Sequence, residues 1–194
     1  MNLRALTAVL IAIPVMVSAQ LPPPSSSWKH TAPESFRANG QMTGVAGGVA
    51  SAIDIQVDRY TPDSDHEVLV KALKEGYAPF LEALRKAPVV GSLKLGQNSY
   101  PIRWARQREQ DKNHRRIAVA TDKPVYFFGA GAADAKPTAG FDVALVEFTV
   151  DVVGLGTGSM APAAKVKAGG PTGIEIQDYS GKLITLATVT RNSK

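Results

Sequence analysis

The sequence predicts an α+β, mainly β domain, built as an antiparallel sandwich or barrel with a short α-helical hairpin inserted. Three observations predict this fold class. Residues 53–57 alternate apolar and polar side chains, which is the period of a half-buried strand. Apolar residues at helical spacing fall in one stretch, residues 64–87. The later segments are joined by turn-length connections, whereas parallel pairing needs crossovers of about a dozen residues.

The N-terminal residues 1–19 have the features of a cleaved signal peptide. Arg4 supplies a positive start, residues 5–17 form an uncharged and mostly apolar run, and small side chains at residues 17–19 suit signal peptidase. The run is shorter than the ~20 residues of a membrane span, and Pro14 interrupts it. We therefore expect an exported protein, periplasmic or extracellular, with no membrane span after cleavage.

The mature chain divides into a leader and one domain. Residues 20–34 are rich in proline and serine and lack an apolar period, so they predict an extended tether. Residues 35–194 have the right length for a single domain with its own core. The composition agrees, because 44% of the residues are hydrophobic and no repeat at solenoid spacing occurs.

The first half of the domain predicts two strands and the helical hairpin. Phe36, Ala38 and Met42 indicate a first strand, and residues 53–57 a second. Residues 64–67, Ser-Asp-His-Glu, have the spacing of a capping box that opens a helix. Gly76 can end that helix, and a second short helix is expected between Pro79 and Pro88.

The second half predicts strands joined by turns. The expected strands are residues 89–95, 101–108, 116–120, 125–128, 141–151, 160–167, 174–176 and 183–189. In residues 101–108, Ile102 and Trp104 share a parity and are expected on one face. Gly154, Gly156 and Gly158 predict a hairpin loop that needs positive φ angles.

The residue inventory excludes several classes of site. The chain has no cysteine, which removes thiol catalysis, cysteine-ligated zinc, iron–sulfur clusters and a lipid-anchored lipoprotein. His30, His66 and His114 have no metal-binding spacing, so we expect neither a metal nor a cofactor. The net charge of +5 is mild, and a nucleic-acid partner is not expected of an exported chain.

A series of short motifs, in a fixed order, runs through the domain. The series is Asp58-Arg59-Tyr60, Leu69 to Lys74, Ala83 to Lys86 with Val90-Gly91-Ser92, Ala105 to Arg108, Ala120 to Pro124, and Val146-Glu147-Phe148 followed by Asp151 and the three glycines. In this order it resembles a group of secreted bacterial proteins of unknown function. The resemblance implies export and a shared fold, and it implies no activity or catalytic residue.

A basic run around Trp104 is the candidate ligand site. Period two on a hairpin strand places Trp104, Arg106 and Arg108 on one side. An apolar floor with guanidinium groups at its rim could bind the oxygens of a carboxylate or phosphate. The cations of this run are Arg103, Arg106, Arg108, Lys112, Arg115 and Arg116.

A structural interpretation of the same residues stays open. Trp104 would then belong to the core, and the arginines would be solvated or paired with acids on adjacent strands. Glu147 shares the parity of Val143 and Leu145 in an otherwise apolar strand, where an unpaired carboxylate is costly. An Arg106–Glu147 ion pair is therefore the alternative hypothesis.

These observations favour a non-enzymatic exported domain that binds a ligand or an envelope partner. The expected partner is an anionic small molecule, a glycan or an envelope protein. One alternative is a secreted hydrolase whose Asp, Glu and Ser residues are brought together only by folding, although no catalytic set can be identified. Another alternative is a purely structural envelope protein.

Overall fold

The structure is a computed structural model that describes residues 32–42, 49–125 and 138–192. The predicted signal peptide, residues 20–31 of the predicted tether, and residues 126–128 of one predicted strand lie outside the described residues. Strand β1 begins at Glu34, which is the last residue of the predicted tether, so the domain begins one residue earlier than predicted.

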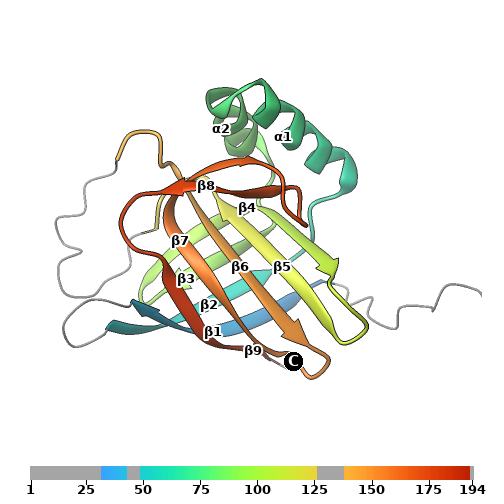
Figure 1. The fold of residues 1–194 in the computed structure, drawn as a ribbon, viewed down its shortest axis with the longest axis vertical. Coiled ribbons are helices and arrows are strands. Elements are labelled where there is room, and N and C mark those ends of the chain that lie inside the picture. The colour runs from blue at the N-terminus through green and yellow to red at the C-terminus, as the bar shows by residue number, and fades with distance from the viewer. Residues whose placement is uncertain (1–31, 43–48, 126–137, 193–194) are drawn as a thin grey trace, which may run out of the picture.

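The described chain forms a closed antiparallel barrel with two helices on one side (Figure 1). The barrel strands run in the order β1-β2-β3-β4-β5-β6-β7-β9 and return to β1, while β8 pairs with the second half of β7. The prediction of a mainly β antiparallel domain is confirmed, and of its two architectures the barrel is the one formed. The elements are β1 (Glu34–Met42), β2 (Val49–Val57), α1 (Asp63–Glu75), α2 (Tyr77–Lys86), β3 (Gly91–Leu95), β4 (Asn98–Glu109), β5 (His114–Thr121), β6 (Val143–Asp151), β7 (Leu155–Ala168), β8 (Ile174–Tyr179) and β9 (Ile184–Asn192).

Two hydrophobic cores lie on opposite sides of the barrel wall. The inner core fills the barrel, and Phe36 and Phe148 meet there edge to face with ring centroids 4.9 Å apart. The outer core lies between the wall and the helices, where Leu69 and Leu84 pack in one cluster with Trp104 of β4. Residues 117–121 of β5 and 143–146 of β6 are therefore buried on both faces, which explains their apolar runs.

The bulge in β4 changes the predicted facing of its aromatic residue. The β4–β5 register shifts between Ile102 and Trp104. Ile102 belongs to the inner core and Trp104 to the outer core. The expectation that both residues share a face is wrong, because a β-bulge adds a residue to one strand and reverses the alternation beyond it.

The helical hairpin is held to the wall by its own polar contacts. Tyr77, the first residue of α2, donates a hydrogen bond to the carbonyl oxygen of Ala164 at 3.1 Å and accepts one from the backbone N–H of Asp142 at 3.0 Å. Helix α1 begins at Asp63 and has no capping hydrogen bond from a side chain, so the predicted capping box is wrong. An ion pair described below replaces it.

The glycines at the start of β7 are required by close backbone approach. Gly156 and Gly158 lie within the strand, and neither has a positive φ angle. A Cβ atom on Gly156 would lie 1.8 Å from the carbonyl oxygen of Thr149, and one on Gly158 would lie 2.2 Å from that of Glu147. The predicted hairpin loop is therefore shorter than expected, and only Gly154 of the three has a positive φ, 87°.

Candidate functional site

Trp104 lies on the outer wall of the barrel, under the helices. Its side chain is fully buried. Its indole Nε1–H donates a hydrogen bond to His66 Nδ1 at 3.1 Å, and the two rings lie nearly parallel with centroids 6.0 Å apart. The structure places Trp104 in the outer core, so it presents no surface on which a ligand could stack.

His66, on α1, lies between β4 and the β7–β8 turn, with one ring nitrogen toward each. Because the Trp104 indole can only donate, Nδ1 accepts and the proton of the neutral ring is on Nε2. Burial lowers the pKa of His66 and nearby Arg106 lowers it further, while Asp63 opposes them. The ring lies against Gly173 in the β7–β8 turn, where a Cβ atom would come within 2.5 Å of Nε2. His66 is thus half-buried, and its lowered pKa favours the neutral form.

Arg106 holds the start of α1 against β4. Its Nη1 donates to Asp63 Oδ1 at 2.7 Å and to the carbonyl oxygen of Thr61 at 3.1 Å. The hydrogen bond from Arg106 also lowers the pKa of Asp63. The predicted Arg106–Glu147 ion pair is not formed in the described chain, because Ala118 lies between the two residues in the strand ladder and Asp63 takes the guanidinium group.

Arg108 and Arg116 lie directly opposite each other on the outer wall. They are register partners in the β4–β5 ladder, and Arg106 lies two residues back along β4. Among the described residues, neither Arg108 nor Arg116 forms an ion pair within 4.0 Å. Directly opposed like charges destabilise a sheet. We call Arg106, Arg108 and Arg116 the outer arginine cluster.

Glu147 borders this cluster on β6. It is half-buried beside the β7–β8 turn, and its carboxylate interacts with the Thr172 side chain through a hydrogen bond. Burial raises the pKa of Glu147 and Glu175 adds to the rise, whereas Arg116 and Thr172 act to lower it. Glu147 is therefore an acid that competes with any added anion for Arg116.

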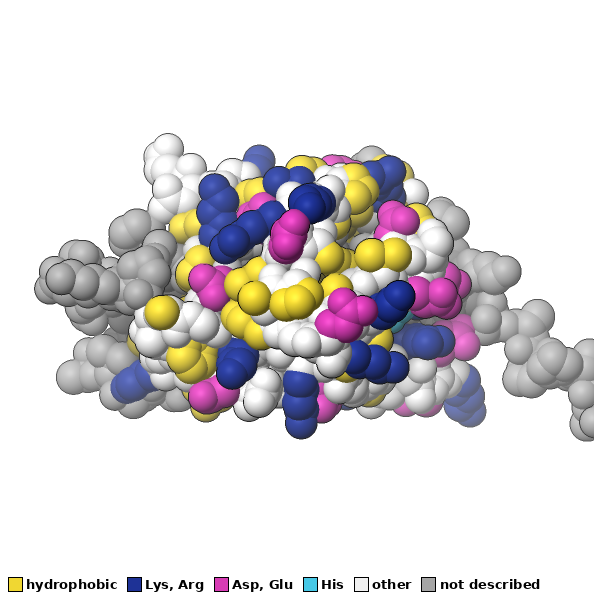
Figure 2. Space-filling view, turned by 90° about the horizontal axis from the view of Figure 1, so that it is seen from above, with side chains coloured by type: hydrophobic (Ala, Val, Ile, Leu, Met, Phe, Trp, Pro, Cys, Tyr) yellow, Lys and Arg dark blue, Asp and Glu magenta, His cyan; other side chains and the backbone are white. Residues whose placement is uncertain are grey.

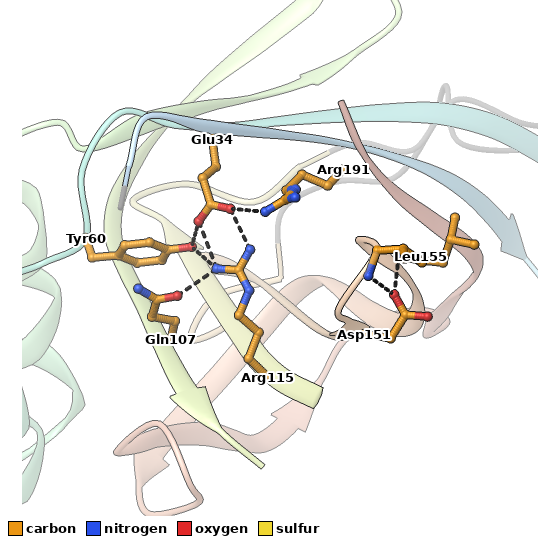
Figure 3. Close-up of polar contacts among 8 residues, drawn as sticks. Glu34, Tyr60, Gln107, Arg115, Asp151, Leu155 and Arg191 are labelled. Atoms are coloured by element: carbon orange, nitrogen blue, oxygen red, sulfur yellow. Dashed lines mark hydrogen bonds and ion pairs between the residues drawn. The ribbon is translucent and has the colours of Figure 1, made fainter. Parts of the chain in front are cut away.

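A second polar cluster closes one end of the barrel, and the sequence reasoning missed it. Arg115 Nη1 donates to Glu34 Oε1 at 2.8 Å and to Gln107 Oε1 at 2.7 Å, while its Nη2 donates to Glu34 Oε2 (Figure 3). Tyr60 donates its hydroxyl to Glu34 Oε1 at 2.8 Å, and Arg191 lies 3.8 Å from the same carboxylate. We call these five residues the barrel-end cluster.

The Arg115–Glu34 pair at the centre of the barrel-end cluster is sealed from solvent. The side chains of Arg115 and Glu34 are 3% and 5% exposed. Burial alone would lower the pKa of Arg115, but the hydrogen bond to Glu34 and the charge of Glu34 raise it. Burial and Glu34 raise the pKa of Tyr60. The group links β1, β4, β5 and β9, so its role is to close the barrel.

A signal for this cluster was present in the sequence. Arg115 has the parity of Ile117 and Val119, the inward residues of β5, and Glu34 has the parity of Phe36. Asp151 at the same end accepts hydrogen bonds from the backbone N–H groups of Val153 and Leu155, both at 2.9 Å (Figure 3). These bonds close the β6–β7 turn and leave Asp151 with a structural role.

Comparison with known proteins assigns no relative. No family model matches the chain, and neither does any curated protein or solved structure. Within the described ranges, no helix is long and apolar enough to cross a bilayer. In the same ranges, no group of three or more His, Asp or Glu side chains is arranged to hold a metal ion.

Proposed function

We propose that this chain is an exported, non-enzymatic domain that binds an anionic ligand at the outer arginine cluster. One observation carries the proposal: Arg108 and Arg116 are directly opposed, and neither forms an ion pair within 4.0 Å with any described residue. The side chains of such a pair begin about 5 Å apart, which lets two guanidinium groups share one oxyanion. A bound carboxylate, sulfate or phosphate group would cancel the repulsion that the fold otherwise retains.

The surroundings of the cluster favour binding over catalysis. His66 is the nearest ionisable ring, but its Nδ1 accepts from Trp104 and its Nε2 faces Gly173. A general base must reach the proton that it removes, and Nδ1, the basic nitrogen of the neutral ring, is engaged by the Trp104 indole. The sequence analysis predicted a pocket with Trp104 as its floor. We propose instead a surface site formed by Arg108 and Arg116, with Arg106 at its edge.

Titration of the mature chain with inorganic phosphate, sulfate and a heparin oligosaccharide tests the proposal. At constant ionic strength we expect saturable stabilisation against heat by at least one probe, and its loss in Arg108→Gln and in Arg116→Gln. Arg59→Gln removes the same charge from an exposed position after β2 and serves as the control. Equal responses of all three variants and the parent chain would show that the cluster binds no anion.

Glu147→Gln sharpens the same test. Removing this carboxylate takes away the competitor beside Arg116, so we expect the apparent dissociation constant for the probe to fall about two- to tenfold. Arg116→Gln in the Glu147→Gln background should abolish the gain. Unchanged or weaker binding by Glu147→Gln would place the anion away from Arg116.

Export rests on residues 1–19 and is tested separately. Expressed in a bacterium with a general secretion system, the chain is expected in the periplasm or medium with Gln20 as its first residue. Intact mass of the recovered protein measures this directly. A full-length chain retained in the cytoplasm would refute export without bearing on anion binding.

A further inference from the structure

The two helices carry a second apolar surface, on the side turned away from the barrel. Their inward faces are covered by the outer core, but a groove of about 470 Å³ remains open between α1 and α2. Apolar side chains gather in the middle of this face, with charged ones around them (Figure 2). Val68 is 61% exposed, although it is one of the larger apolar residues of α1. We call this surface the helix groove.

The helix groove is lined by one stripe from each helix. On α1 the stripe consists of Asp65, Val68, Leu69, Ala72 and Glu75, spaced three or four residues apart with one adjacent pair. The second stripe consists of Pro79, Glu82, Ala83 and Lys86 of α2, with Ala87 and Pro88 directly after the helix. The floor is therefore small and apolar, and it is long enough to accept a second helix lengthwise.

The groove is lined by three acids and one base, and the two charges left outside an ion pair are both acidic. Glu82 is paired with Lys86 at 2.6 Å, so these two cancel. Asp65 and Glu75 stand at the two ends of the α1 stripe, and among the described residues neither forms an ion pair within 4.0 Å. At 1.5 Å rise per residue they lie about 15 Å apart along the helix. The groove is acidic on a chain whose net charge is +5.

We propose that the helix groove docks an amphipathic helical segment of a partner protein. The segment presents an apolar face to Val68 and Ala72 and two basic side chains, about 15 Å apart, to Asp65 and Glu75. Charge complementarity at both ends sets the register of the segment along the groove. This surface is separate from the outer arginine cluster and does not depend on the proposed anion binding.

The same charges argue against three other occupants. In a two-fold dimer joined groove to groove, Asp65 and Glu75 of one copy would face the same acids of the other. An anionic bilayer and a nucleic acid would be repelled for the same reason. A basic amphipathic helix is the occupant that satisfies both the apolar floor and the acidic ends.

Peptide binding to the mature chain tests this proposal. The probe is a fluorescein-labelled 18-residue Leu/Ala helix with Lys at two positions ten residues apart, and the matched control carries Glu at both. We expect fluorescence anisotropy to show saturable binding of the Lys peptide, at least tenfold tighter than the Glu peptide. Val68→Glu should weaken that binding at least tenfold without loss of thermal stability, because Val68 is mostly exposed.

A charge swap makes the test specific. Asp65→Lys combined with Glu75→Lys should reverse the preference, so that the Glu peptide binds more tightly. Lys71→Glu, which changes an exposed residue of α1 outside the groove, should leave both affinities unchanged. Equal affinity for the two peptides, no binding, or no effect of Val68→Glu would overturn the proposal. A molar mass by light scattering that doubles in a Val68-dependent way would assign the groove to a second copy and also overturn it.

Discussion

Arg115 and Arg116 are neighbours in the sequence and lie on opposite sides of the barrel wall. Arg115 points inward, where Glu34, Tyr60 and Gln107 accept hydrogen bonds from its Nη atoms and its side chain is 3% exposed. Arg116 points outward, facing Arg108 across the ladder. A buried guanidinium group must be paired within the fold, whereas one that still reaches solvent, as half-buried Arg116 does, can pair with an anion from solution. The alternation of a single strand thus separates a structural arginine from a candidate binding arginine.

Arg115→Met removes the inward-pointing arginine and should cause the largest loss of unfolding free energy among these variants. It leaves the Glu34 carboxylate buried without its main partner, which costs about 3–5 kcal/mol in comparable sites. Urea unfolding followed by tryptophan fluorescence measures the loss. Arg116→Met is the matched control, one residue away, and should change the unfolding free energy by less than about 0.5 kcal/mol. Similar losses for the two variants would contradict the difference between the two sides.

The stability difference between the parent chain and His66→Gln should depend on pH. Because the pKa of His66 is lowered by burial, the unfolded chain binds more protons than the folded chain below the ordinary value of 6.5. The stabilisation from neutral His66 is therefore complete above that pH and is lost as the pH falls through the lowered pKa. The advantage of the parent chain over the variant should shrink from pH 7 to pH 5, by less than about 1.4 kcal/mol per pH unit.

A second titratable group also contributes to the pH dependence of the parent chain. Glu147 acts with the opposite sign, since its raised pKa makes the folded chain hold its proton more tightly. For this reason the parent is compared with the single variant and not judged by its own profile. An advantage that grows on acidification would mean that His66 is protonated in the fold.

Arg108→Gln should give the smallest effect, and its sign is the informative part. Removing one of two opposed guanidinium groups relieves a repulsion of about 0.2–1 kcal/mol, so stability should stay equal or rise slightly at low salt. The gain should vanish near 1 M salt, where the Debye length is about 3 Å. Thermal melts at the two salt concentrations measure it. A salt-independent loss of stability would indicate that Arg108 has a structural partner.

The alternation of apolar and polar residues was enough to predict the antiparallel strands, but it did not show what covers them. The antiparallel strands, the inserted hairpin and the shared side of Trp104, Arg106 and Arg108 follow from alternation and turn-length connections. Alternation could not show the bulge after Ile102, because a bulge depends on the partner strand. It also could not show that the helices cover Trp104, which is a tertiary contact across the wall.

The candidate site was predictable only in part, for a similar reason. The parity of Arg115 with Ile117 marked it as inward, but its partner Glu34 is 81 residues away and was assigned to the tether. Arg106 forms an ion pair with Asp63 at the start of α1, 43 residues away, and not with Glu147 as predicted. Sequence patterns locate charged side chains on a face, whereas the choice among distant partners depends on how the hairpin packs.

Arginine-specific modification with phenylglyoxal, read by tandem mass spectrometry, tests the central difference most directly. Arg108 and Arg116 should both react in the folded mature chain, well before Arg115, and a bound anionic probe should protect both. Arg115 should resist modification until urea unfolds the protein, because its side chain is 3% exposed and hydrogen-bonded to Glu34. Modification of Arg115 in the folded chain at the rate of Arg116 would contradict the assignment of the two neighbours to opposite sides of the wall.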